Sequence, residues 1–127
     1  MKERLIKMLD DEDLEFANIM KHLGMQREAA ILITYLGRAG EATSKEIEQA
    51  TGLRQPEVSV VIRDLRGENM IDVRDVKTGG KGRPSLFYAL RTPMQDIIKR
   101  LEDEKLKEHA EAMENVRKLK ERASSWC

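Results

Sequence analysis

Two helix starts separated by one tight turn constrain this chain more than any other feature of its sequence. Residues 43–46 have the spacing of a capping box, in which Thr43 caps a helix and the Glu46 carboxylate reaches back to it. Gly52 is expected to end this short helix, because glycine readily takes the left-handed conformation found at helix ends. Pro56 is expected to begin the next helix, where its missing amide proton is not needed. The chain therefore places two short helices on either side of a turn.

A β-hairpin is predicted directly after the second of these helices. That helix has apolar residues at three- and four-residue spacing, which should face inward: Val58, Val61, Ile62 and Leu65. Residues 71–76 and 85–90 alternate with the two-residue period of strands, and the segment between them, 77–83, holds three glycines and three basic residues. Residues 43–66 thus have the spacing of a helix-turn-helix, and residues 71–90 would supply the wing of a winged-helix domain.

The segments before the turn are also predicted to be helical. Residues 1–9 have the apolar pattern of a short amphipathic helix, and the acidic cluster at 10–13 supplies carboxylates for a helix start. A metal site is the alternative interpretation of that cluster. Residues 26–38 carry apolar side chains over more than half of the helix surface, so this helix should form the buried centre of the domain. Gly37 and Gly40 are expected to end it.

A long helix is predicted at the end of the sequence. Residues 92–95 give a second strong start, with Thr92 as the cap and Pro93 as the first helical residue, and nothing breaks the helix until about Ala123. Some thirty residues at 1.5 Å each span about 45 Å, which is longer than a domain of this size is wide. Such a helix needs a partner, and the most economical partner is a second copy. We expect dimer contacts from its two apolar stripes: Ile97, Leu101, Ala112, Val116, Leu119 and Trp126.

These patterns predict a mainly α fold with a small β-hairpin wing (α+β), a winged helix-turn-helix with a long C-terminal helix for dimerisation. The expected parts are an N-terminal helical segment at 1–24, the winged helix-turn-helix at 25–92 and the dimerisation helix at 93–127. The composition agrees, because 36% charged and 4% aromatic residues favour helices with solvated faces over an aromatic-rich β-barrel. A length of 127 residues suits one core.

Several classes of protein are excluded by what the sequence lacks. No apolar run reaches the roughly 18 residues of a membrane span and no signal peptide opens the chain, so we expect a cytoplasmic protein without a membrane partner. Cys127 is the one cysteine, and His22 and His109 have no companion ligands, so neither a disulfide framework nor a metal is expected. No nucleophile has an adjacent base and no phosphate loop follows a strand, so we expect neither an enzyme nor a cofactor.

The charge is uneven along the chain, which a random fluctuation also explains, and the kind of residues that are basic favours a nucleic acid as partner. The 23 basic and 23 acidic residues cancel, which argues against a polybasic protein, but residues 51–92 carry a net charge of +3 and residues 1–50 a net charge of −3. A helix fits the major groove of DNA and reads base edges with its first residues, while a basic glycine-rich hairpin can follow the phosphates. The residues expected to contact DNA are Thr43, Ser44, Arg54, Gln55, Pro56, Ser59, Val60, Arg63, Lys77, Lys81 and Arg83.

Residues 28–92 resemble the winged-helix domain of archaeal and bacterial transcriptional regulators of the MarR and TrmB type. Three stretches carry the resemblance, at 40–47, at 51–58 and at 81–90, where Gly-Arg-Pro-Ser precedes an aromatic strand. The resemblance implies a homodimer that binds double-stranded DNA at a near-palindromic site. It also implies a recognition helix at 55–66.

The same resemblance places the wing tip at 77–83, and the sequence departs from the pattern at two points. The usual helix end of the family has a glycine just before the first wing strand, and residues 67–70, Gly-Glu-Asn-Met, stand in its place here. The 127 residues hold no counterpart of the sugar-binding domain of full-length TrmB proteins, so no effector pocket is carried over and the effector is unknown. An alternative function is a winged helix that docks on proteins of a transcription assembly, which the acidic first half and the charged long helix fit equally well.

Overall fold

The computed structural model describes residues 9–76 and 85–126. The described residues fall into two compact units, the first ending at Met94 and the second beginning at Gln95. The elements are α1 (Asp11–His22), α2 (Arg27–Ala39), β1 (Glu41–Ala42), α3 (Ser44–Thr51), α4 (Gln55–Gly67), β2 (Ile71–Val76), β3 (Ser85–Leu90) and α5 (Met94–Ala123). The predicted fold class, a mainly α protein with a small β wing and a long last helix, is confirmed. None of the described helices has the length and apolarity needed to cross a membrane.

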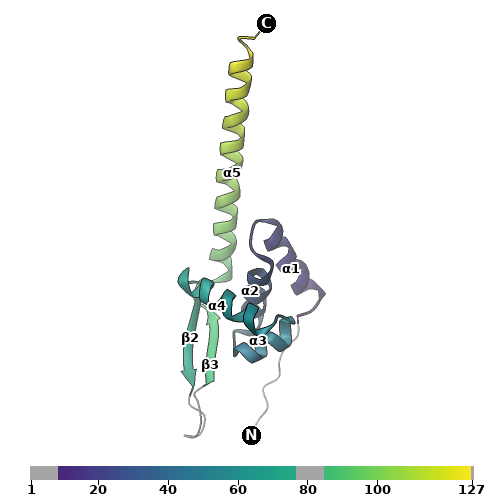
Figure 1. The fold of residues 1–127 in the computed structure, drawn as a ribbon, viewed down its shortest axis with the longest axis vertical. Coiled ribbons are helices and arrows are strands. Elements are labelled where there is room, and N and C mark those ends of the chain that lie inside the picture. Colours follow the sequence, from purple (N-terminus) through teal and green to yellow (C-terminus); the bar gives the residue numbers. More distant parts are fainter. Residues whose placement is uncertain (1–8, 77–84, 127) are drawn as a thin grey trace. The chain divides into compact units, whose positions relative to one another are not determined.

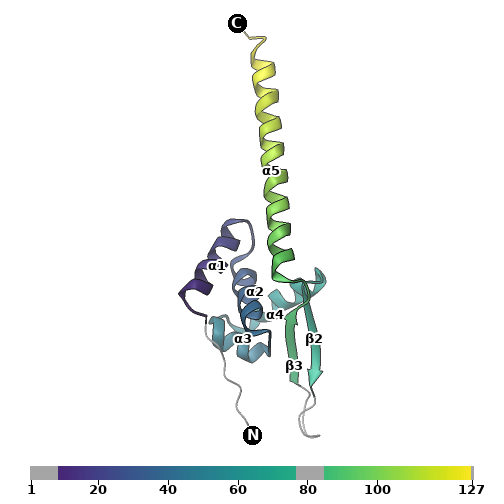
Figure 2. The same ribbon diagram turned by 180° about the vertical axis from the view of Figure 1, so that it is seen from behind.

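Helix α2 is the centre of the first unit. Every residue from Ala29 to Leu36 is buried, which requires neighbours on all sides of the helix, and α1, α3, α4 and β3 supply them. Seen from either side, the elements follow one another as α1, α2, α4 and the β2–β3 hairpin (Figures 1 and 2). The prediction that Gly37 helps to end α2 is wrong, because the helix continues through it to Ala39. Gly40 follows with a φ of 87°, a conformation that glycine adopts without strain.

Helix α1 starts at the predicted acidic cluster. The Asp13 amide donates to the Asp10 carboxylate at 2.8 Å, and the Asp10 amide donates to the Asp13 carboxylate at 3.3 Å, which together form a capping box. Asp13 also forms an ion pair of 3.1 Å with Arg38 of α2. Ala17 and Met20 bury the inner face of α1 against α2. The predicted helix over residues 1–9 lies almost wholly outside the described residues.

The predicted capping box and stop of α3 are confirmed. The Glu46 amide donates to the Thr43 hydroxyl at 3.1 Å, and the Thr43 amide donates to the Glu46 carboxylate at 2.9 Å. Gly52 ends the helix with a φ of 77°. Ile47 and Ala50 lie on its buried face. The turn that follows leads directly into α4, as the spacing of the two helix starts required.

Helix α4 begins and ends slightly away from the predicted positions. It starts at Gln55, so Pro56 occupies the second helical position, where its missing amide proton is still not needed. Gly67 is its last helical residue, and the left-handed turn that follows is made by Asn69, with a φ of 61°. Asparagine tolerates this conformation better than most residues, so the glycine is not needed at the turn. The predicted inward residues are all buried: Val58, Val61, Ile62 and Leu65.

The sheet has one strand more than the sequence predicted. Strands β2 and β3 have the predicted bounds and pair antiparallel, with Val76 opposite Ser85 and Ile71 opposite Leu90. The two-residue strand β1 pairs antiparallel with the other edge of β3, which gives the order β1-β3-β2. β1 directly precedes α3, so the hairpin is tied by backbone pairing to the start of the helix-turn-helix.

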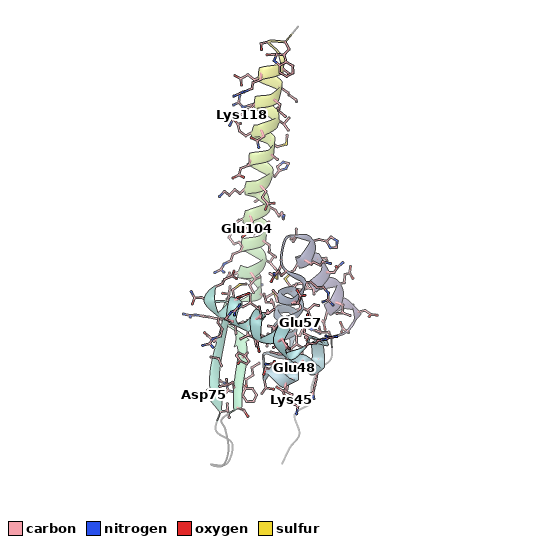
Figure 3. The ribbon with its side chains drawn as sticks, in the orientation of Figure 1. Lys45, Glu48, Glu57, Asp75, Glu104 and Lys118 are labelled. Carbon is pink, nitrogen blue, oxygen red and sulfur yellow. The ribbon has the colours of Figure 1, made fainter. Side chains whose placement is uncertain are left out.

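Helix α5 has the predicted extent but a different start. The Thr92 hydroxyl donates to the Asn69 carbonyl oxygen at 3.2 Å, and the helix begins only at Met94, so the prediction of a Thr92 cap is wrong. Charged side chains cover most of α5, Glu104 and Lys118 among them (Figure 3). Arg117 pairs with Glu114 and with Glu121 one turn away, and the hydrogen bonds from its guanidinium lower the pKa of the Glu114 carboxyl. These pairs suit a solvated helix surface.

Candidate nucleic-acid interface

The exposed face of α4 carries the side chains that were predicted to read DNA. Burial of the apolar face leaves Gln55, Ser59, Val60 and Arg63 in solvent, with Val60 46% exposed. The Gln55 side-chain amide donates a hydrogen bond of 2.9 Å to the Ser59 hydroxyl. Two of the predicted contact residues are thus held together one helical turn apart. Pro56 is exposed beside them.

The two predicted arginines at this helix are both exposed and only weakly engaged. The Arg54 amide donates to the Glu57 carboxylate at 2.9 Å, which uses the backbone of Arg54 and not its guanidinium. Arg63 approaches Asp64 at 3.4 Å, with side chains that are 75% and 55% exposed. An ion pair this exposed contributes little, so an incoming phosphate or base can compete for the Arg63 guanidinium.

The start of α3 lies near this face, and its residues differ in exposure and in the hydrogen bonds they already make. The Thr43 hydroxyl already accepts the hydrogen bond from the Glu46 amide. Ser44 is half-buried, and Lys45 is exposed, as Figure 3 shows. Lys45 was not among the predicted contact residues, although its place in the capping box put it on the first turn of the helix.

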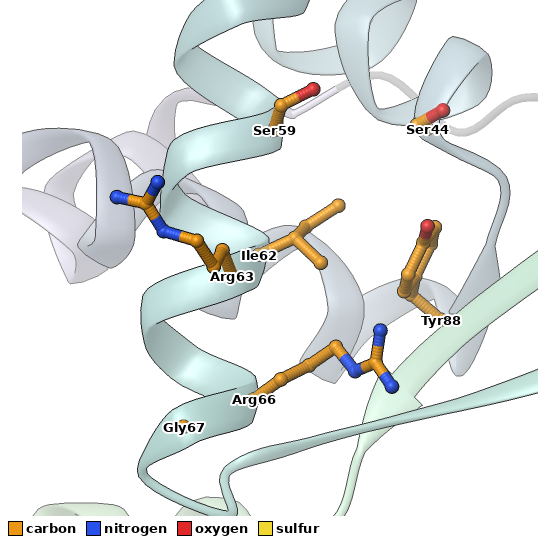
Figure 4. Close-up of a pocket in the computed structure, with 7 residues that line it drawn as sticks. All are labelled: Ser44, Ser59, Ile62, Arg63, Arg66, Gly67 and Tyr88. Atoms are coloured by element: carbon orange, nitrogen blue, oxygen red, sulfur yellow. The ribbon is translucent and has the colours of Figure 1, made fainter.

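A hollow of about 490 Å³ lies between α4, the start of α3 and strand β3 (Figure 4). Its lining residues come from three parts of the sequence: Ser44, Ser59, Ile62, Arg63, Arg66, Gly67 and Tyr88. None of them is acidic, and two are arginines. The hollow therefore joins two of the predicted helix residues, Ser59 and Arg63, to the predicted residue Ser44 and to the hairpin.

Sequence reasoning did not select Arg66 and Tyr88. The signal for Arg66 was present, since it follows Ser59 by two helical turns and therefore lies on the same side of α4. Tyr88 lies on the face of β3 that also carries Leu86 and Leu90, because alternate residues of a strand share a face. The tertiary packing decides which of the two strand faces lies toward α4. This packing brings Tyr88 to the hollow.

The opposite face of the sheet carries a polar strut. Arg74 of β2 donates from Nε to the Glu41 carboxylate of β1 at 2.8 Å, and its Nη2 donates to the other oxygen. The guanidinium lies 5.3 Å from the ring centre of Phe87, its register partner on β3. The hydrogen bonds to Glu41 raise the pKa of the Arg74 guanidinium further above its ordinary value. This strut spans all three strands and connects the hairpin to the segment before α3.

The remaining predicted residues belong to the wing tip and to α5, and the structure describes only those of α5. Lys77, Lys81 and Arg83 of the wing tip lie outside the described residues, as does Cys127. On α5 the two apolar stripes separate: Ile97 and Leu101 are 1% and 8% exposed, so they offer little surface to a partner. The second stripe is exposed: Ala112 lies in solvent, and the exposed fractions of Val116, Leu119 and Trp126 are 38%, 68% and 78%.

No metal centre is found in the part of the chain that the structure describes, where no group of three His, Cys, Asp or Glu side chains is placed to hold an ion. His22 instead has its Nδ1 at 2.8 Å from the carbonyl oxygen of Asn18, on its own helix. The acidic residues of the 10–13 cluster act at the start of α1 and in the ion pair to α2.

Solved structures share this fold at low sequence identity. A possible transcriptional regulator from Methanosarcina mazei Go1 has a TM-score of 0.54 and 13% identity, over 92% of this chain and 98% of that chain. Diamide-treated YodB from B. subtilis has a TM-score of 0.50 and 13% identity, over 79% of this chain and 92% of that one. NadR in complex with 4-hydroxyphenylacetate has a TM-score of 0.50 and 15% identity, over 91% and 86%. At these identities the likeness concerns the fold alone.

The sequence comparisons give one match to a known family. None of the curated proteins compared with this chain matches it. Residues 23–82, which include α2, α3, α4 and β2, match the model of the MarR family. This segment overlaps the resemblance found at residues 28–92 and contains the exposed face of α4. The match covers 60 of the 127 residues, somewhat less than half of the chain, and shows that this segment is similar to the MarR family.

Proposed function

We propose that this protein is a sequence-specific regulator of transcription that binds double-stranded DNA as a homodimer. The observation that carries the proposal is the division of α4 into a buried apolar face and an exposed face with Gln55, Ser59, Val60 and Arg63. A helix with such a face fits the major groove, where amide, hydroxyl, methyl and guanidinium groups each have partners on base edges. The exposed Arg54 and the basic segment at 77–83 add contacts to phosphates.

The homodimer is proposed from α5. Its second stripe leaves large apolar side chains exposed, Leu119 and Trp126 among them, on a helix whose other faces are charged. A second copy would cover this stripe with the same side chains. Two protomers related by a two-fold axis would place their α4 helices about 34 Å apart, one turn of DNA, on a near-palindromic site.

Docking on another protein is the second candidate function. Its support is the charge of α4, where Glu57 and Asp64 balance Arg63 and Arg66, so that the helix itself carries no net charge. A neutral surface gains little from the general attraction between basic residues and phosphates. Binding to DNA then depends on specific contacts, whereas binding to a protein does not require any basic excess.

A gel-shift experiment with a pool of genomic fragments at low salt separates the two candidates. DNA binding predicts that a subset of fragments is retained and that raising the salt concentration releases them with a moderate slope, as a few phosphate contacts per protomer require. Protein docking predicts that no duplex is retained at low salt. Arg63→Ala, which removes an exposed guanidinium from α4, should change which fragments are retained and leave the thermal stability unchanged.

A further inference from the structure

The hollow between α4 and β3 contains three hydrogen-bond donors without a partner among the described residues. They are the Ser44 hydroxyl, the Arg66 guanidinium and the Tyr88 hydroxyl. In Figure 4 the Arg66 side chain extends from α4 toward β3, which carries Tyr88, whereas the Arg63 guanidinium lies on the other side of the helix. Arg66 thus projects into the hollow, whereas Arg63 also lines it but turns its guanidinium away from Tyr88.

The chemistry of the lining selects an oxyanion. A guanidinium offers a planar fork of donors that matches the oxygens of a phosphate, and hydroxyl groups add single donors. No carboxylate lines the hollow, and Ile62 is its one aliphatic residue, so neither a cation nor an apolar molecule finds suitable groups there. The volume of about 490 Å³ exceeds that of an isolated phosphate and leaves room for the sugars on either side of a phosphodiester.

The position of the hollow agrees with a DNA strand as the source of that phosphate. It is bounded by α4, which is proposed to enter the major groove, and by β3 of the hairpin, which is proposed to reach an adjacent part of the duplex. A backbone that runs between these two contacts crosses the hollow. We propose that Arg66, assisted by the Tyr88 and Ser44 hydroxyls, binds one DNA phosphate in this hollow; the assignment rests on the proposed function. Contacts of this kind fix the register of a protein on DNA and carry no sequence information.

The test is fluorescence anisotropy of labelled duplexes with the full chain, measured over about 50–200 mM salt. Arg66→Gln should lower the affinity about tenfold at low salt, since it removes a charge-assisted hydrogen bond. It should also reduce the slope of log affinity against log salt by about 0.9 per protomer. Both effects should be equal for two duplexes of unrelated sequence, because a phosphate contact is blind to the bases. Tyr88→Phe should lower the affinity a fewfold and leave the slope unchanged, since it removes no charge.

Two further variants control this measurement. Arg100→Gln makes the same charge change at an exposed position of α5, on the side of the helix away from the second stripe, and should change neither affinity nor slope. Arg66→Lys keeps the charge and loses the fork, so it should restore the salt slope but only part of the affinity. Because Arg66 is exposed, neither of its variants should lower the thermal stability.

The outcomes separate this assignment from the function on which it rests. If the wild-type chain binds duplexes and Arg66→Gln binds them with the same affinity and slope, the phosphate site is refuted while DNA binding stands. If the wild-type chain binds no duplex, both are refuted. A third arm titrates inorganic phosphate into the protein and follows the Ser44 amide by NMR. Shifts that disappear in Arg66→Gln, with DNA binding unaffected by that variant, would assign the hollow to a free anion and overturn the proposal.

Discussion

The side-chain amide of Gln55 donates a hydrogen bond of 2.9 Å to the hydroxyl of Ser59 on the exposed face of α4. The two residues are separated by one helical turn, so the bond holds the long glutamine side chain along the helix surface. The glutamine keeps one N–H and its carbonyl oxygen for a ligand, the pair of groups that matches an adenine edge. The hydrogen bond therefore orients a candidate base-reading group before DNA arrives.

Ser59→Ala tests this orientation. It removes the acceptor for Gln55 and a hydroxyl from the proposed interface, and it leaves the buried face of α4 intact. We expect a changed preference among DNA sequences, of about tenfold between the best site and its single-base variants, because a good bidentate base contact contributes about 1–3 kcal/mol. Selection from a random duplex pool, with competition between the selected sites, measures the preference. An unaltered ranking of sites would remove Ser59 and Gln55 from base readout.

Arg83→Glu tests the wing. Residue 83 lies outside the described residues, and its role is predicted from the basic glycine-rich sequence of 77–83. Reversal of its charge should weaken binding to all duplexes by a similar factor, since a phosphate contact carries no sequence information. Anisotropy titrations with two unrelated duplexes provide the comparison. If the affinity of the variant for both duplexes equals that of the wild-type chain, this segment is not a DNA-contacting wing.

Glu41→Gln tests the strut between β1 and β2. It keeps the shape of the side chain and removes the charge that Arg74 binds through two hydrogen bonds. The sheet should remain folded, because β2 still pairs with β3 from Ile71 to Val76. The hairpin should, however, be held less firmly to β1, the segment before α3. We expect faster amide hydrogen exchange in β1 and at the neighbouring register positions of β3. Exchange rates equal to those of the wild-type protein would show that the strut does not restrain the hairpin.

Asp13→Asn tests the tie between α1 and α2. Asp13 is 6% exposed and is both a member of the α1 capping box and the ion-pair partner of Arg38. Loss of its charge should lower the free energy of unfolding by about 1.5–3 kcal/mol, the range for hydrogen bonds to a charged group. The matched control is Asp11→Asn, an exposed carboxylate in the same helical turn. Denaturant titration of both variants measures the difference, and equal stabilities would contradict the account of α1.

Leu119→Glu tests the proposed dimer. The side chain is 68% exposed in the single chain and lies in the middle of the second stripe of α5. A carboxylate there would be buried without a partner in a dimer, so the variant should sediment near 14.6 kDa while the wild-type chain sediments at twice that mass. Lys118→Glu, on another face of the helix, should remain dimeric. A wild-type chain that is itself monomeric would overturn the proposed dimer.

Local signals in the sequence were enough for most of the fold. Thr43, Glu46 and Gly52 specify the bounds of α3 through hydrogen bonds between near neighbours, and the alternation of β2 and β3 reproduces their observed ends. The side chains that face solvent on α4 follow from its period of 3.6 residues, which needs no knowledge of the rest of the chain. Where the physical cause is local, the sequence was sufficient.

Apart from the helix ends at Gly37, Pro56 and Gly67, the failures involve contacts between distant residues. Thr92 was predicted to cap a helix, but its hydroxyl is bound by the Asn69 carbonyl oxygen, a group far away in the sequence. Strand β1 is only two residues long and forms because it pairs with the free edge of β3. A strand this short has no sequence pattern that predicts it. Arg66 and Tyr88 meet at the hollow only because the sheet turns one particular face toward α4. Such placements are set by packing and not by local propensity.

Selection of bound fragments from a random pool of duplex DNA tests the central claim, that the exposed face of α4 reads a double helix, most directly. The account predicts enrichment of a near-palindrome whose half-sites lie about one helical turn apart, and loss of that enrichment when Arg63 is replaced by alanine. Recovery of unselected sequences at low salt by the wild-type protein, with no enriched motif, would contradict it.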